Sequence, residues 1–153
     1  MAKRTKDRKT LGELLELKQS VLMAGPGDPA ETLTYEVPLA NFEGSRLPPG
    51  KFRILVRIDR ATQALRTIDV KLRDSWRVAG VVKVKSAGAR LLFARVLPEF
   101  GPALTEISAE GSGTVVFVPV GTRTIATRTD FKHVTPYEDR FNVKIGPLKA
   151  IDF

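Results

Sequence analysis

The most constraining stretch of the chain is a nine-residue segment in which apolar and basic side chains alternate. Residues 51–59 read Lys-Phe-Arg-Ile-Leu-Val-Arg-Ile-Asp. Phe52, Ile54, Val56 and Ile58 fall on one face of an extended chain, whereas the basic residues fall on the other. This period predicts a β-strand with one buried face and one basic face.

A different period follows this strand and predicts a helix. Apolar residues recur at spacings of three or four at Ala61, Ala64, Leu65, Ile68, Leu72 and Trp76. Such spacing produces one apolar stripe along a helix of about four turns. Asp59 is placed to cap the N-terminus, because its carboxylate can accept hydrogen bonds from the free amides of the first turn. We therefore expect one long helix packed against the sheet.

The remaining segments have the composition of strands, turns and loops. Alternating or apolar runs predict strands at 33–39, 77–85, 90–97, 114–120 and 140–145. The run at 114–120 is nearly continuous and predicts a buried strand. Residues 86–89 predict a turn around Gly88, and residues 99–113, rich in Gly, Pro, Ser and Glu, predict an exposed loop. The Thr- and Arg-rich segment 122–129 predicts an edge strand or a contact loop, and 148–153 a short tail strand.

The N-terminal part predicts a basic arm followed by an amphipathic helix. Thr10 and Glu13 have the spacing of a capping box, and the Gly/Pro-rich segment 24–29 predicts a hinge that ends the helix. The helix could pack on its own domain, on another subunit or on a membrane surface, although its glutamates disfavour the membrane. The residues expected to mediate self-association are Leu11, Leu14, Leu15 and Leu22.

These elements together predict an α+β protein with a single globular domain. The domain is expected to be a mostly antiparallel twisted β-sheet with one long helix packed on it, preceded by the N-terminal amphipathic helix on its Gly/Pro hinge. The predicted boundaries are 1–29 for the arm, helix and hinge and 30–153 for the domain. A chain of 153 residues with 42% hydrophobic side chains can build such a core. It has no cysteine, which excludes disulfides and thiolate metal sites.

Positive charge is concentrated in the central block. The chain carries a net charge of +8, and residues 51–95 hold twelve Lys or Arg against three Asp. A basic face on a folded module favours binding to phosphate, on nucleic acid or on an anionic membrane surface. The alternative is a solvated face that keeps the protein soluble. The residues expected to bind nucleic acid or membrane are Lys3, Arg4, Lys6, Arg8, Lys9, Arg53, Arg57, Arg66, Lys71, Arg73, Arg77, Lys83, Lys85 and Arg90.

Catalytic signatures are not found in the sequence. His133 is the only histidine, so no two-histidine metal site can form. The sequence Gly111-Ser-Gly113 lacks the lysine and the spacing of a P-loop and predicts a turn. We therefore expect no enzymatic activity, no metal, no cofactor and no small-molecule substrate.

The order of elements in the central block resembles that of rhabdovirus matrix proteins. The features that carry the likeness are the strand, the helix closing on Trp76, the segments 77–85, 110–117 and 137–145, and the lysine-rich arm in front. The resemblance implies a small α+β protein of the virion and host cytoplasm that lines the inner face of a membrane. It also implies self-association into a lattice and bridging between an anionic membrane and ribonucleoprotein. The chain lacks the Pro-Pro-x-Tyr budding motif found in many members.

Two other functions remain open. A basic arm followed by many short strands also suits a small capsid protein of jelly-roll type. A monomeric nucleic-acid-binding module rich in β-structure is the third possibility.

Overall fold

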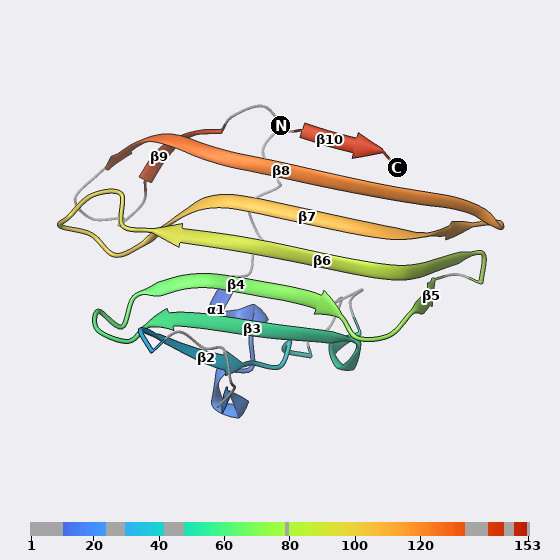
Figure 1. Ribbon diagram of the computed structural model, residues 1–153, viewed down its shortest axis with the longest axis horizontal. Helices are drawn as coiled ribbons and strands as arrows, with labels where there is room; N and C mark the ends of the chain where they lie inside the picture. Colours follow the sequence, from blue (N-terminus) through green and yellow to red (C-terminus); the bar gives the residue numbers. More distant parts are fainter. Residues whose placement is uncertain are drawn as a thin grey trace, which may run out of the picture.

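The computed structural model describes residues 11–23, 30–41, 48–78, 80–133, 141–145 and 149–152. Ten antiparallel strands form one sheet, in the order β1-β2-β3-β4-β6-β7-β8-β10, with β5 beside β6 and β9 beside β8 (Figure 1). Most neighbours in the sheet are neighbours along the chain, as in a meander, except that β6 also lies beside β4 and β10 lies beside β8. The bounds are β1 Val21–Met23, β2 Thr32–Glu36, β3 Phe52–Asp59, β4 Leu65–Leu72, β5 Trp76–Val78, β6 Val82–Ala94, β7 Ala103–Val115, β8 Val118–His133, β9 Phe141–Ile145 and β10 Lys149–Asp152.

Helix is confined to short turns in the described part of the chain. The helix α1 spans only Leu11–Leu14, and two 3-10 turns span Leu17–Gln19 and Pro49–Lys51. No helix in these residues is long and apolar enough to cross a membrane. The expected α+β class is therefore wrong, and the protein is a nearly all-β sheet.

The predicted long helix between residues 61 and 76 is instead a turn followed by two strands. Gln63 has a left-handed φ of 54°, which a helix does not admit. From residue 67 onward the chain alternates Thr-Ile-Asp-Val-Lys-Leu, which is the period of a strand, and its β-branched residues favour extended structure. The apolar residues between 61 and 76 can be counted at helical spacings of three and four. That count passed over the alternation of apolar and polar residues from residue 67 onward, which is typical of a strand.

The predicted N-terminal amphipathic helix is also wrong. After α1 the chain forms a bridge between Leu15 and Leu39, and then β1 pairs with β2. Leu15 is 8% exposed and belongs to the core cluster. The amide of Ala40 donates a hydrogen bond to the carbonyl of Leu14. This segment packs on the sheet, while the predicted hinge at 24–29 lies outside the described residues.

The core lies on one face of β2, β3 and β4. Val37, Ile54 and Ile68 are buried there with Leu15 from the N-terminal segment. The register pairs Ile54 with Val70 and Val56 with Ile68, so the alternating apolar residues of the two strands face the same side. The predicted strand at 51–59 is thus confirmed, together with its apolar face. Half-buried residues from the surrounding strands extend the core: Tyr35, Leu39, Val56, Leu65, Val70, Leu91 and Phe93.

Two long strands replace the turn and the loop expected between residues 77 and 113. The predicted strands at 77–85 and 90–97 are joined by β6, which runs through the expected turn at 86–89, whereas Arg77 and Val78 belong to the separate strand β5. The predicted loop 99–113 is mostly β7. A Cβ built on Gly113 would lie 2.3 Å from the carbonyl oxygen of Lys83. Glycine is needed there because the two backbones approach closely at a bulge in β6.

The hairpin between β7 and β8 contradicts the expected buried strand at 114–120. Val115 pairs with Val118, so Val116 and Phe117 form a two-residue turn, with φ values of 48° and 69°. Such turns favour Asn-Gly, because both central residues need a positive φ. Here a β-branched and an aromatic residue adopt it, and the Phe117 side chain is 95% exposed.

Candidate polyanion-binding face

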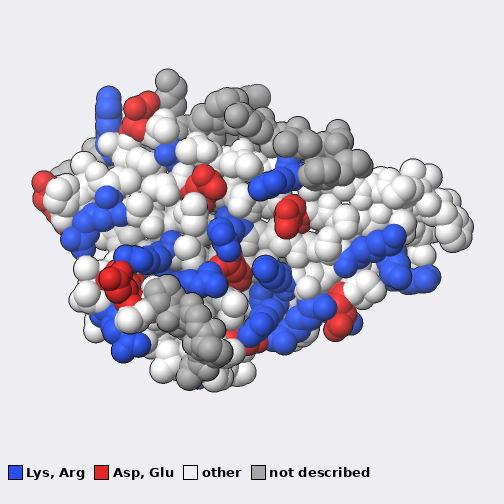
Figure 2. All heavy atoms as spheres, in the orientation of Figure 1, with Lys and Arg blue, Asp and Glu red and all other residues white. Residues whose placement is uncertain are grey.

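The face of the sheet opposite the core carries charged side chains from β2, β3, β4, β6, β7 and β8. Alternation places Arg53 and Arg57 of β3 on this face, because their neighbours Ile54 and Val56 point to the core. The register then aligns Asp69 of β4 with Arg90 of β6. It also aligns Glu110 of β7 with Arg123 of β8. We call this side the basic face. Figure 2 views the sheet from this side, with Lys and Arg spread across it among fewer Asp and Glu.

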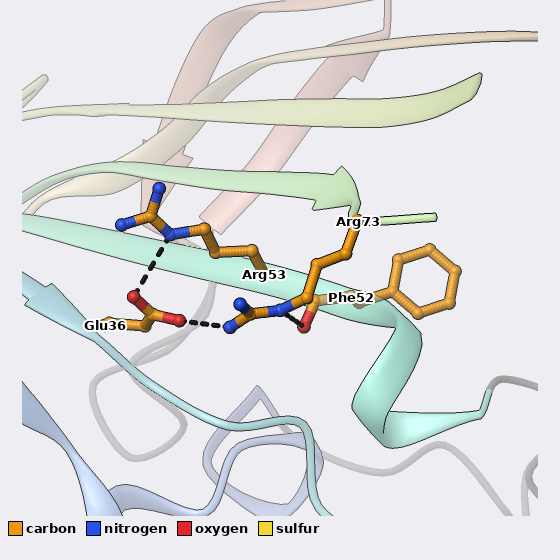
Figure 3. A network of polar contacts seen from close by, with 4 residues as sticks. All are labelled: Glu36, Phe52, Arg53 and Arg73. Carbon is orange, nitrogen blue, oxygen red and sulfur yellow. Dashed lines mark hydrogen bonds and ion pairs between the residues drawn. The ribbon is translucent and has the colours of Figure 1, made fainter. Parts of the chain in front are cut away.

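Two arginines share the carboxylate of Glu36 at one end of the basic face. Arg53 donates from Nε to Oε2 at 3.1 Å, and Arg73 donates from Nη2 to Oε1 (Figure 3). Arg73 also donates from Nε to the carbonyl oxygen of Phe52 at 3.4 Å. Desolvation opposes ionisation of Glu36, but the hydrogen bonds and charges of the two arginines outweigh it and lower its pKa. One carboxylate with two guanidinium groups leaves an excess positive charge.

A second group of the same kind lies at the centre of the face. Arg57 and Arg90 each form an ion pair with a different oxygen of Asp69. Asp69 is 5% exposed, whereas the two arginines reach solvent. The buried carboxylate therefore holds two cations at fixed positions and again leaves an excess positive charge.

Asp59 ends β3 and organises the turn that precedes β4. It accepts hydrogen bonds from the amide and hydroxyl of Thr62 at 2.8 and 2.9 Å. These hydrogen bonds and the charge of Arg66, 2.7 Å away, lower the pKa of Asp59. Asp59 was predicted to cap a helix. It does accept a hydrogen bond from an amide three residues ahead, as a capping residue does, but the segment that follows is a turn and not a helix.

A shallow hollow opens on the basic face above Gly88, which has no side chain to fill it. The hollow has a volume of about 480 Å³. The register puts Lys71 and Glu110 on either side of Gly88. The charged and hydroxyl side chains that line it are Asp69, Lys71, Lys85, Ser86, Arg90, Ser108, Glu110 and Arg123. Cations with hydroxyl donors around a concavity are suited to phosphate oxygens.

The predicted basic residues divide into two groups by their partners. Arg53, Arg57, Arg66, Arg73 and Arg90 are engaged with carboxylates. Within the described residues, no carboxylate lies within ion-pair distance of the second group, which consists of Lys71, Arg77, Lys83 and Lys85. The five predicted residues of the arm, Lys3, Arg4, Lys6, Arg8 and Lys9, lie outside the described part.

Arg123 is a member of this face that sequence reasoning did not assign. Its segment looked like an edge strand or a loop, whereas β8 lies inside the sheet between β7 and β10. Its position opposite Glu110 follows from the register alone. The charge pattern of 122–129 carries no signal for that pairing.

The predicted self-association residues do not form one surface. Leu15 is buried, Leu14 is half-buried, and Leu22 is 54% exposed on β1. The side chain of Leu11 lies outside the described set.

Groups that could hold a metal ion are not found in the described part of the chain, where no three His, Cys, Asp or Glu side chains gather.

No protein-family model, curated protein or solved structure matches this chain. The resemblance to rhabdovirus matrix proteins stays a prediction, and one of its features, the helix ending at Trp76, is a pair of strands in this structure.

Proposed function

We propose that the protein is a self-assembling structural protein that binds nucleic acid along the basic face of its sheet. The observation that supports this function is the contrast between the two faces of β6, β7 and β8. On one face, Lys71, Lys85 and Arg123 line the hollow above Gly88, and none of them has a carboxylate within ion-pair distance among the described residues. The other face presents small uncharged side chains in the middle of these strands. Binding and assembly, rather than catalysis, make use of such surfaces.

Nucleic acid is favoured over a small anion by the extent of the basic face. Excess positive charge recurs from the Glu36 group on β2 and β3, through the Asp69 group on β3, β4 and β6, to Arg123 on β8. A phosphate backbone presents regularly spaced charges to such a series of cations and releases counterions when bound. A single phosphate would engage only the hollow.

Self-assembly is supported by the small-residue face, which consists of Ala87, Ala89, Ala109, Gly111, Thr122, Thr124 and Ala126. The register places these residues on the core side of the sheet, beyond the core itself. Ala109 and Thr122 are exposed and the others are half-buried. Side chains this small allow a second sheet to approach to about 10 Å.

The lack of charge on this face suits a second copy of the chain, since none of the seven residues that define it is charged. β6 and β7 have 13 residues each and span roughly 40 Å, and three strands are about 14 Å wide. The small-residue face takes up only the middle of these strands, so contact between two copies would have to extend along most of their length to bury the roughly 1,000 Å² of a specific interface.

The setting of this function follows from the resemblance alone. A location in the virion and host cytoplasm, and a matrix-type role, stay predictions. The jelly-roll alternative has less support, because the described strands follow chain order instead of a Greek key.

Two neighbouring substitutions on β7 test the proposal. Ala109→Lys places a charge on the small-residue face, and Glu110→Lys places the same charge on the basic face. In sedimentation velocity, the unmodified chain should exceed its monomer mass of 16.8 kDa and sediment together with a single-stranded oligonucleotide. Ala109→Lys should be a monomer that still binds the oligonucleotide, while Glu110→Lys should assemble and bind more tightly. A monomeric unmodified chain that leaves the oligonucleotide unbound would contradict the proposal.

A further inference from the structure

Exposed apolar side chains gather at one end of the sheet. The hairpin of β7 and β8 and the adjoining hairpin of β5 and β6 end side by side, at the right of Figure 1. The amide of Val116 donates a hydrogen bond to the carbonyl of Val81 at 3.0 Å and joins the two tips. We call this end the apolar tip; its exposed residues are Val78, Val81, Val115, Val116, Phe117, Val118 and Val120.

The shape of the apolar tip suits insertion and not enclosure of a ligand. Phe117 is 95% exposed, Val118 61% and Val116 59%. The side chains stand on a projecting turn, which is the mostly white right-hand end in Figure 2. A convex apolar surface cannot enclose a ligand. It can leave water only by entering an apolar medium such as a lipid bilayer, or a groove in a partner.

The backbone of the apolar tip is held in an unfavourable conformation. Val116 and Phe117 both occupy the left-handed region, which β-branched and bulky residues rarely adopt. Asn-Gly would form this turn without strain. The side chains of Val116 and Phe117 therefore do not serve to stabilise the turn. The turn instead presents two apolar side chains at its outermost point.

Positive charge at the base of the tip identifies the partner. Arg77 of β5 lies directly opposite Lys83 of β6, one residue from Val78 and two from Val81. Like charges that face each other across a strand pair are unfavourable, and neither has a carboxylate within ion-pair distance in the described part of the chain. Anionic groups just below an apolar insertion would relieve this repulsion.

We infer that the apolar tip inserts into the surface of an anionic lipid bilayer. Phe117 and Val116 enter the boundary between headgroups and acyl chains, while Arg77 and Lys83 contact lipid phosphates. An anionic bilayer has its phosphate groups at the surface and its hydrocarbon chains beneath them. This order matches that of the tip, whose cations lie behind its apolar end. The nucleic-acid surface above Gly88 is built from other residues, so the tip adds a second partner to the proposed function.

The test is binding of the full chain to phosphatidylcholine vesicles with and without phosphatidylserine. Pelleting should require phosphatidylserine and decrease as salt is raised. Phe117→Ser should weaken binding by about tenfold or more, because a buried aromatic side chain is lost. Arg77→Ala with Lys83→Ala should weaken it on the order of tenfold. Val21→Ser, which removes a 59% exposed side chain on β1, at the other edge of the sheet, and Arg95→Ala, which removes an exposed cation just beyond the opposite end of β6, are matched controls that should bind normally.

A fluorescent variant reports where the tip lies. In Trp76→Phe with Phe117→Trp, the single indole should shift its emission to the blue on anionic vesicles and be quenched by brominated acyl chains. Unchanged binding of Phe117→Ser, or an indole that stays in water when the protein pellets, would overturn the inference. Normal vesicle binding combined with a loss of self-association in Phe117→Ser would also overturn it and assign the tip to a second copy of the chain. Oligonucleotide binding should be the same in Phe117→Ser, which separates this inference from the proposed function.

Discussion

Arg77 and Lys83 face each other in the antiparallel pair of β5 and β6, although both carry positive charge. Reversing one charge should turn repulsion into attraction. We expect Lys83→Glu to stabilise the fold by about 0.2–1 kcal/mol, measured by urea unfolding. The same variant should bind anionic vesicles less well.

A double variant is the control for this effect. With Arg77→Glu added to Lys83→Glu, the pair again has like charges, and the gain in stability should disappear. If Lys83→Glu and the double variant are equally stable, the two side chains do not interact across the strands.

The turn at Val116 and Phe117 makes a second prediction. Replacing the two residues by Asn-Gly should stabilise the protein by about 1–3 kcal/mol, since Asn and Gly adopt the left-handed region readily. Thermal unfolding measures the change. The variant should lose binding to anionic vesicles, because Asn-Gly removes the two apolar side chains that insert into the bilayer. A lower melting temperature would show that the native turn is unstrained.

The buried carboxylate of Asp69 should matter more than either arginine that it binds. Asp69→Ala leaves Arg57 and Arg90 beside each other without an anion, and we expect a loss of about 1–3 kcal/mol in the free energy of unfolding. Arg57→Ala or Arg90→Ala should each cost less, because the remaining arginine still pairs with Asp69. The losses are measured by chemical denaturation. Equal losses in the three variants would mean that Asp69 does not stabilise the two arginines jointly.

The lowered pKa of Glu36 predicts how stability depends on pH. Because the folded pKa lies below the ordinary value of 4.5, the unfolded chain binds the proton more readily in acid. The contribution of Glu36 is therefore present above pH 4.5 and is lost as the pH falls toward the folded pKa. Asp59 adds a loss of the same sign below its ordinary value of 3.8. Glu36→Gln should be less stable at neutral pH and should show a flatter decline between pH 5 and pH 3 in urea titrations.

Local alternation was a good guide to single strands, and β3 is the clearest case. Its apolar side packs in the core, and its arginines lie on the charged face. The segment after it was misread because Ala61 and Ala64 extended the three- and four-residue spacing through a turn. The alternation of Ile68, Val70 and Leu72 was the better signal, because β-branched residues on alternate positions favour a strand.

The tip and the hollow depend on pairing that a local pattern does not contain. A continuous apolar run at 114–120 is typical of a buried strand, and only the pairing of Val115 with Val118 turns it into an exposed hairpin. Gly88 looked like a turn residue, whereas it lies within β6 between Lys71 and Glu110. The cations around it come from β4, β6 and β8. Only the register between these strands shows that they lie close together.

The most direct test of the central claim is the salt dependence of binding to single-stranded RNA. Lys71→Ala with Arg123→Ala removes two cations of the hollow that have no ion-pair partner in the described part of the chain, while Arg66→Ala removes a cation paired with Asp59. Each phosphate contact contributes about 0.7 to the slope of log affinity against log salt concentration. We predict that the double variant lowers the slope by about 1.4 and weakens binding, while Arg66→Ala keeps the slope of the unmodified chain. An unchanged slope in the double variant, or an equal decrease in Arg66→Ala, would contradict the basic face as the nucleic-acid surface.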